Sequence, residues 1–383
     1  MCQVCARKFL AQLPSPRHIH LRRRPAQYRW VADPTQSEAS REHAGLRRRR
    51  GTWQAARGRT PLVLLTPSGQ TLMQFNSLLD VRPPYYALDR VELHKPGFVG
   101  ARIRPEQPLG HEVGPLAAAE AGRHLAILGA CACRSLRESN PEYEHHYYLP
   151  QRARLLRHPD RTPTQQPRFA ASARSESRKG RNATAHSVLY AADSGATLFE
   201  LDVSYRVLSQ GAFERVFAPH KRDLRATPRE DATRDLEQLV ALRSNPYQKP
   251  LPLEITRRTP ESVRARLRTV TPDLCAGHFP LYPSLPVAVL MHALSSLCGE
   301  ALRGRWGNAA RYRVVAADVS AERLAFVGER LLFEAAFRQS NGDREHYQAW
   351  AMLEDGRSIG WMAIELQPVR HDMRIERTTP AFI

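Results

Sequence analysis

The chain has 383 residues, of which 42% are hydrophobic and 25% are charged, so it is long enough for two domains with full cores and is typical of a soluble globular protein. It contains no run of about 18 uncharged apolar residues, so we expect no membrane-spanning helix. The six cysteines are too sparse for a disulfide scaffold and favour a reducing compartment, so we expect a cytoplasmic protein. Cys2 and Cys5 have zinc-site spacing, but no second Cys/His pair of that kind follows, so we expect no metal.

The net charge of +19 is concentrated toward the N-terminal end. Residues 1–72 contain 14 Lys or Arg and 3 Asp or Glu, which leaves a balance of +8 for residues 73–383. The first stretch has no convincing periodic apolar face, and three interpretations of it stay open. It is a disordered arm that binds nucleic acid or a membrane surface, a targeting segment, or translated noncoding sequence upstream of a true start at Met73.

Residues 73–240 are expected to form a first domain. Phe98–Ile103 predicts a strand, and the Ala-rich segment Leu116–Cys131 predicts a helix whose small side chains let a sheet wrap closely around it. Residues 158–181 are polar, rich in Arg and contain Pro, which predicts a long mobile loop. Apolar and polar residues alternate along Thr197–Val207, which indicates a half-buried antiparallel strand.

Residues 241–383 are expected to form a second domain that repeats this order, after a short connecting helix at Asp235–Arg243. Leucines near helical spacing predict a second central helix at Val287–Leu302. Strands are predicted around that helix at Leu253–Ile255, Val263–Val270, Tyr312–Val315, Leu331–Phe337, Tyr347–Leu353 and Ile359–Leu366. Each half thus gives an early strand, a central helix and several further strands.

A loop with Gly, His and Pro precedes each predicted central helix. The second loop is Gly277-His278-Phe279-Pro280, followed by Pro286 and the helix, and a weaker copy runs from Gly110-His111 to Gly114-Pro115. This arrangement puts an imidazole beside the positive end of a helix dipole, where a thioester carbonyl could also bind.

The segment Gly277–Pro286, together with the order of the elements, resembles the β-hydroxyacyl-acyl-carrier-protein dehydratase family, which has the hotdog fold. Arg82–Val91 resembles the segment that opens this family's domain, and the resemblance covers roughly residues 73–370. It implies an α+β double hotdog, in which two antiparallel sheets are each wrapped around a central helix.

In that family the loop histidine of one copy faces a carboxylate on the central helix of the other copy. The carboxylate lies 14 positions after the histidine of its own copy, and counting from His278 gives His292 instead of an acid. Aligning the first half on the start of its helix brings Glu120 to the acid position. The resemblance therefore implies one composite catalytic site of His278 and Glu120, and a degenerate pairing of His111 with His292.

The resemblance implies a dehydratase or hydratase of 3-hydroxyacyl thioesters in fatty-acid or polyketide-type synthesis. His278 would be the base, and Glu120, with its pKa raised in an apolar helix, would protonate the leaving hydroxyl. Backbone N–H groups at a helix start would receive the enolate-like oxygen. The substrate-binding residues expected from it are Gly277, Phe279, Pro280, Gly114, Leu116 and His111.

This reaction needs no cofactor, because the substrate is carried on the phosphopantetheine of an acyl carrier protein or on coenzyme A. The moderate positive balance of residues 73–383 is compatible with an acidic carrier protein. Two other functions stay open for the same fold: a thioesterase that uses Glu120 and a water, and a non-catalytic protein that binds acyl carriers. A fused pair of hotdogs satisfies the usual dimer internally, and a higher homo-oligomer stays possible.

Each candidate residue also has a structural interpretation. Glu120 could form an ion pair with Arg123 or His124, which follow it by three and four positions. His292 is expected to be a core or interface histidine. Glu112 is expected to be a solvated loop charge.

Overall fold

A computed structural model describes residues 79–137, 145–159, 168–176, 180–222 and 245–369. All of them belong to one compact unit, Leu64–Ile383. The N-terminal stretch 1–72 and the connecting helix expected at Asp235–Arg243 lie outside the described residues. No helix among those residues is both long enough and apolar enough to cross a membrane.

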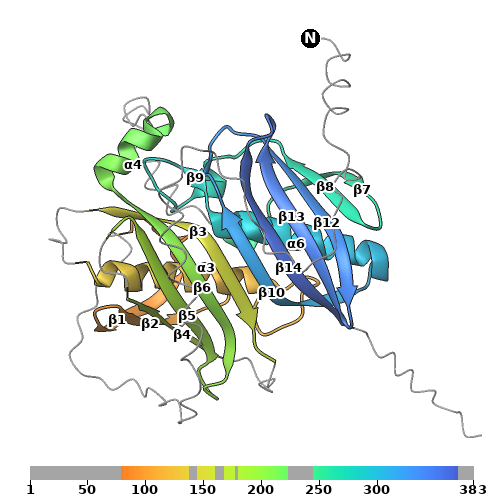
Figure 1. Ribbon diagram of the computed structural model, residues 1–383, viewed down its shortest axis with the longest axis horizontal. Coiled ribbons are helices and arrows are strands. Elements are labelled where there is room, and N and C mark those ends of the chain that lie inside the picture. Colours follow the sequence, from red (N-terminus) through yellow and green to blue (C-terminus); the bar gives the residue numbers. More distant parts are fainter. Residues whose placement is uncertain (1–78, 138–144, 160–167, 177–179, 223–244, 370–383) are drawn as a thin grey trace, which may run out of the picture. The chain divides into compact units, whose positions relative to one another are not determined.

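An antiparallel sheet of 12 strands forms the framework of this unit (Figure 1). Six strands of the first half lie in the order β1-β2-β4-β5-β6-β3. They are β1 (Leu88–Lys95), β2 (Phe98–Ile103), β3 (His146–Arg157), β4 (Phe169–Ser175), β5 (Asn182–Ala191) and β6 (Thr197–Ser209).

Six strands of the second half continue the same sheet in the order β10-β14-β13-β12-β8-β7. They are β7 (Glu254–Arg258), β8 (Ser262–Leu267), β10 (Arg311–Ala321), β12 (Leu331–Asn341), β13 (Arg344–Leu353) and β14 (Ser358–Val369). The two halves join where β3 pairs with β10, from Leu156 opposite Ala316 to Arg152 opposite Ser320. Two short strands, β9 (Ser284–Leu285) and β11 (Ala325–Phe326), pair separately.

Two long helices, α3 (Ala118–Ser135) and α6 (Val287–Trp306), pack on the sheet and against each other. Small residues let them approach the strands closely. A Cβ on Gly129 of α3 would lie 2.6 Å from the Tyr205 hydroxyl, which donates a hydrogen bond of 2.6 Å to the carbonyl of Ala126. The shorter helices are α4 (Gln210–Phe217), η5 (Ala218–His220), η6 (Pro246–Gln248) and η7 (Asp273–Cys275).

Each long helix is thus covered by antiparallel strands, as expected for a hotdog fold, but the strands of the two halves form one continuous sheet and not the two separate sheets that were expected. The predicted central helices and the strands at residues 98–103 and 197–207 are confirmed. The prediction of one long loop over residues 158–181 is wrong, because β4 lies inside it. Its alternate residues Phe169, Ala171 and Ala173 are buried, and the alanines admit α3 at close range.

Candidate active site

The loop before α6 is held by backbone contacts from the first half of the chain. Arg82 N–H donates a hydrogen bond of 2.7 Å to the carbonyl of Gly277, and Val81 forms an antiparallel bridge with His278. Gly277 and Phe279 have positive φ angles of 77° and 49°. A Cβ on Gly277 would lie 2.2 Å from the Arg82 carbonyl oxygen, so no other residue fits there without displacing the backbone.

His278 is buried in this loop, with 7% of its surface exposed. Its Nδ1 lies 2.9 Å from the carbonyl oxygen of Ser284 and 3.3 Å from the Ser284 hydroxyl. Because a carbonyl oxygen only accepts, Nδ1 carries the proton and Nε2 carries the lone pair. Burial lowers the pKa of His278 to about 4, although its bond to Ser284 opposes the shift, so the imidazole is neutral at pH 7.

Aromatic rings from both halves surround His278. The Tyr85 ring meets the imidazole edge-on with 5.0 Å between centroids. Phe279 packs against Tyr147 and against Phe213 of α4, with 5.3 Å between centroids in each pair. Phe279 also packs on the imidazole, with 4.1 Å between centroids, so rings on two sides restrict its orientation.

Glu120 is fully buried near the start of α3, and its carboxylate holds the backbone of a neighbouring turn. The carboxylate accepts hydrogen bonds from the backbone N–H of Glu106 at 2.5 Å and of Gln107 at 3.2 Å. His124 Nε2 lies 3.5 Å from Glu120 Oε1, but burial lowers the pKa of His124, and Arg123 pairs with Glu106, so the expected ion pair of Glu120 is not formed. No hydrogen bond or ion pair joins Glu120 to His278 within the described residues.

His292 of α6 is half-buried. Burial lowers the pKa of His292, an effect that the Glu120 carboxylate opposes and Arg123 reinforces. The helices α3 and α6 pack against each other, and the role of His292 as a core or interface histidine stays a prediction.

The loop before α3 has the opposite character. His111 is exposed, whereas Glu112 is buried and accepts a hydrogen bond of 2.9 Å from the N–H of Ala118, the first residue of α3. Burial raises the pKa of Glu112 to about 7, although the bond from Ala118 and the charge of Arg157 oppose the shift. The expectation that Glu112 is a solvated loop charge is wrong, because its carboxylate lies under the helix start.

The other substrate-binding candidates lie in or beside these two loops. Leu116 is a core residue, with 1% of its surface exposed. A Cβ on Gly114 would lie 2.6 Å from an Arg157 guanidinium nitrogen, so Arg157 packs directly on this glycine. Pro280 is half-buried in the His278 loop.

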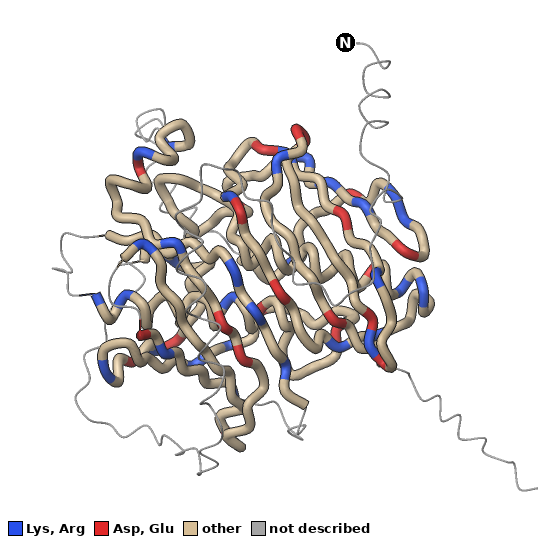
Figure 2. Tube along the Cα trace, viewed as in Figure 1, with Lys and Arg blue, Asp and Glu red and all other residues tan. Residues whose placement is uncertain are grey.

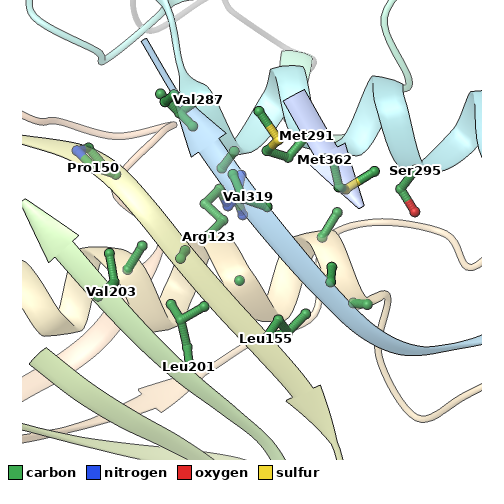
Figure 3. A pocket seen from close by; sticks show the side chains of 18 of the residues that line it. Arg123, Pro150, Leu155, Leu201, Val203, Val287, Met291, Ser295, Val319 and Met362 are labelled. Atoms are coloured by element: carbon green, nitrogen blue, oxygen red, sulfur yellow. The ribbon is translucent and has the colours of Figure 1, made fainter. Parts of the chain in front are cut away.

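A cavity of about 90 Å³ lies between the two long helices and the strands at the junction of the halves (Figure 3). The first turns of both helices border it, through Ala118 and Ala119 of α3 and Val287 and Ala288 of α6. Most of its remaining lining is apolar, and the polar exceptions are Tyr85, Arg123, Gln151, Arg152 and Ser295.

Neither His278, Glu120 nor the predicted substrate-binding residues line this cavity. Tyr85 links the two regions, because it both borders the cavity and contacts the His278 ring. Sequence reasoning did not identify Tyr85 as a site residue, and no local pattern marks it. The sequence suggested Arg123 only as an ion-pair partner of Glu120. An arginine inside an apolar helix is also a sign of a buried charge, which is rare without partners.

Four backbone N–H groups at the helix starts donate no hydrogen bond to another described residue. They belong to Ala119 and Glu120 of α3 and to Val287 and Ala288 of α6. The other N–H groups of these first turns are engaged, because Ala118 donates to Glu112, and Val289 and Leu290 donate to Pro286. No group of three or more His, Cys, Asp or Glu side chains that could hold a metal occurs in the described ranges.

No family model matches this chain, and no curated protein matches it in sequence. Solved structures with a similar fold include an acyl-CoA thioesterase II from Mycobacterium marinum, with 11% identity, a TM-score of 0.43 and coverage of 74% of this chain and 96% of that one. A putative oleoyl thioesterase from Lactobacillus plantarum has 13% identity, a TM-score of 0.43 and coverage of 73% and 99%. An acyl-ACP thioesterase from Bacteroides thetaiotaomicron has 13% identity, a TM-score of 0.42 and coverage of 71% and 98%.

These structures are described as thioesterases, which contradicts the expectation of a dehydratase or hydratase. The resemblance found in the sequence therefore extends to the hotdog fold and not to the dehydratase family. The contacts of Glu120 agree with this correction, because the carboxylate assigned to the leaving hydroxyl is occupied by backbone donors.

Proposed function

We propose that this chain is a double hotdog protein that hydrolyses acyl thioesters. The observation that carries the proposal is the mainly apolar cavity bordered by the first turns of both long helices, where Ala119 and Ala288 have N–H groups without a partner among the described residues. An acyl chain is apolar and fits such a lining. The N–H groups of Ala119 or Ala288 can stabilise the oxyanion that forms when water adds to the thioester carbon.

His278 is the residue we propose as the base. Its lone pair on Nε2 can take a proton from the attacking water, because the imidazole is neutral above pH of about 4. The oxyanion then collapses and the carbon–sulfur bond breaks, which leaves a carboxylic acid. The leaving thiolate takes the proton from Nε2 of His278 and departs as a free thiol. In this proposal Gly277, Phe279 and Pro280 hold the His278 loop, and Tyr85 connects it to the cavity.

The leaving thiol that we propose belongs to coenzyme A or to the phosphopantetheine arm of an acyl carrier protein, and no further cofactor takes part. Figure 2 shows Lys and Arg interspersed with Asp and Glu along the strands. This distribution favours recognition of the carried group over a strong charge attraction to a carrier protein.

The second candidate function is binding of acyl thioesters without turnover. One observation favours it: the lining of the cavity, taken over the described residues, contains neither Asp nor Glu. A catalytic carboxylate is therefore missing from the space where the thioester would lie. His278 does not border this space either, and the ring of Tyr85 lies between the two.

Incubation of the full chain with coenzyme A thioesters from butanoyl to palmitoyl separates these functions. We expect release of free thiol, with no enoyl absorbance from the 3-hydroxyacyl thioester. Binding without thiol release would exclude the hydrolase and support the second candidate. Neither binding nor release would exclude both.

A cavity-filling variant tests whether the reaction uses this space. Val319 of β10 borders the cavity and is half-buried, so Val319→Trp should block the acyl chain while the protein still folds. Val315→Trp is the matched control, because Val315 is half-buried on the same strand but does not border the cavity. Equal thiol release from both variants would show that the cavity is not the site.

A further inference from the structure

Arg123 is a buried arginine in the lining of an otherwise mainly apolar cavity. Only 2% of its side chain is exposed, although it lies on a helix made largely of Ala, Leu, Gly and Cys. Figure 3 shows Arg123 between the apolar side chains of the two long helices and the central strands. A guanidinium group is almost never buried without partners, so its surroundings need an explanation.

Among the described residues, only one of the three guanidinium nitrogens of Arg123 has a hydrogen-bond acceptor. Its Nη2 pairs with a carboxylate oxygen of Glu106, and its charge lies over the Tyr247 ring at 5.6 Å from the centroid. The N–H groups on Nε and Nη1 are buried and have no acceptor among these residues. Leaving buried donors on a charged group unpaired is costly, which indicates that a further acceptor reaches them in the functional state.

We propose that the acyl group bound in this cavity carries an uncharged oxygen acceptor, a keto group, which receives hydrogen bonds from Arg123. This inference rests on the proposed function, since it assumes that the cavity holds an acyl thioester. A hydrocarbon chain offers no acceptor and would leave Nε and Nη1 unpaired. The class of substrate would therefore be oxoacyl thioesters.

The charges around Arg123 favour a neutral acceptor over a carboxylate. Glu106 already neutralises the guanidinium, and Glu120 lies one helical turn before it. A carboxylate on the acyl chain would thus bring a further negative charge to a guanidinium that is already paired, in a cavity whose lining is mainly apolar. A keto oxygen brings no charge and satisfies the same donors.

The position of Arg123 along α3 sets the position of the keto group. Arg123 follows Ala119 by one turn, and a turn rises by about 5 Å, so the two lie near each other along the helix axis. Helical side chains lean toward the N-terminus, which brings the guanidinium back toward the helix start. With the thioester oxygen at the helix start, the keto group belongs on the third to fifth carbon of the acyl chain.

Binding of amide analogues tests this inference without depending on hydrolysis. The probes are pantetheine amides of hexanoic, 3-oxohexanoic, 5-oxohexanoic and adipic acids, in which N–H replaces the thioester sulfur. The full chain should bind at least one oxo analogue about tenfold or more tightly than the hexanoyl analogue by calorimetry. Equal affinities, or no binding at all, would overturn the proposal, and tightest binding of the adipoyl analogue would overturn the choice of an uncharged acceptor.

Arg123→Met tests whether this arginine causes the preference. The variant keeps an apolar side chain of similar length, and Glu106 stays half-exposed and can be hydrated. We expect the preference for the oxo analogue to disappear, while hexanoyl binding stays within about threefold. Arg154→Met is the matched control, because Arg154 is an exposed arginine of β3 that does not border the cavity, and it should keep the preference.

Thermal unfolding of the Arg123→Met protein shows whether it is folded, and Arg123→Lys supplies a second variant if it is not. Lysine keeps the charge opposite Glu106 but lacks the fixed fork of donors, so it too should lose most of the preference. A preference that survives in the folded variant would overturn the role of Arg123. Loss of thiol release with the oxo preference intact would instead refute the proposed hydrolysis and leave this inference standing.

Discussion

The loops that precede α3 and α6 occupy corresponding places in the two halves, and each contains a histidine next to a glycine. In the second loop His278 points inward, donates from Nδ1 to Ser284 and is enclosed by aromatic rings. In the first loop His111 points to solvent, and the next residue, Glu112, is buried in its place and caps the helix. One loop therefore buries a neutral base, and the other buries an acid that stabilises a helix start.

The comparison shows what joining the halves in one chain allows. In a homodimer both loops would have one sequence, so a change that adapts one loop to a structural role would also alter the loop with the proposed catalytic histidine. Here Gly277 is packed under the Arg82 carbonyl, whereas the corresponding Gly110 has no heavy atom within 4 Å of an added Cβ. In the second loop, contacts fix both Gly277 and His278. In the first loop, the main contact is the hydrogen bond that Glu112 accepts from Ala118.

Replacing the two loop histidines should give the largest difference. His278→Gln should lower thiol release by about 10²–10⁴-fold, because a positioned general base is worth that much. His111→Gln should change it by less than about twofold, since the His111 side chain is exposed and plays no part in the proposed reaction. Initial rates with one acyl-coenzyme A thioester measure both, and equal losses would end the assignment of different roles.

Alanine at the two loop glycines should give the next largest difference. Gly277→Ala should lower the free energy of unfolding by about 3 kcal/mol or more, because its Cβ would clash with backbone 2.2 Å away. Gly110→Ala meets no atom and should cost only about 1 kcal/mol, for its positive φ of 57°. Urea denaturation measures both, and a cost for Gly110→Ala as large as that for Gly277→Ala would contradict the contrast.

The two loops should also give stability opposite dependences on pH. The pKa of Glu112 is raised from 4.5 to about 7, so the folded state binds the extra proton, and stability falls by at most roughly 3 kcal/mol as pH rises through this window. The pKa of His278 is lowered from 6.5 to about 4, so stability falls as pH decreases from 6.5 toward 4. Glu112→Gln should remove the first slope and His278→Gln the second, as measured by urea denaturation across this range.

Removing the Ser284 hydroxyl should have the smallest effect. The backbone carbonyl of Ser284 lies nearer to His278 Nδ1 than the hydroxyl does, at 2.9 Å against 3.3 Å, and Ser284→Ala keeps it. We expect a loss of about 1 kcal/mol or less in unfolding free energy and less than about a tenfold loss in thiol release. A loss as large as that of His278→Gln would show that the hydroxyl, and not the carbonyl, orients the imidazole.

Much of the fold could be predicted from local patterns. Thr197–Val207 alternates and is a strand, and Val287–Leu302 has helical spacing and is a helix. Strand β3 was missed because it contains Pro150 and three arginines. Pro150 lies outside the pairing of β3 with β10, which runs from Arg152 to Leu156, and on the β6 side it lies opposite Tyr205 beside a shift in register, a position where proline is tolerated in a sheet.

The candidate site was less predictable, because it depends on contacts between distant segments. Burial of His278 follows from Tyr85, which lies in the other half, and no pattern near His278 indicates it. Glu112 has the composition of a solvated turn, and only the return of α3 over it makes it buried. For Arg123 the sequence carried a signal, an arginine in an apolar helix, but its partners Glu106 and Tyr247 are defined only by the fold.

The pairing of β3 with β10 has a consequence for how the protein behaves on dilution. Both strands belong to one polypeptide, so the seam between Arg152 and Ser320 forms by an intramolecular step. A cavity built between two separate subunits would empty and open as the subunits part at low concentration, whereas this one persists in a single molecule. The chain can therefore keep the cavity that we propose as its acyl site when the protein is scarce in the cell.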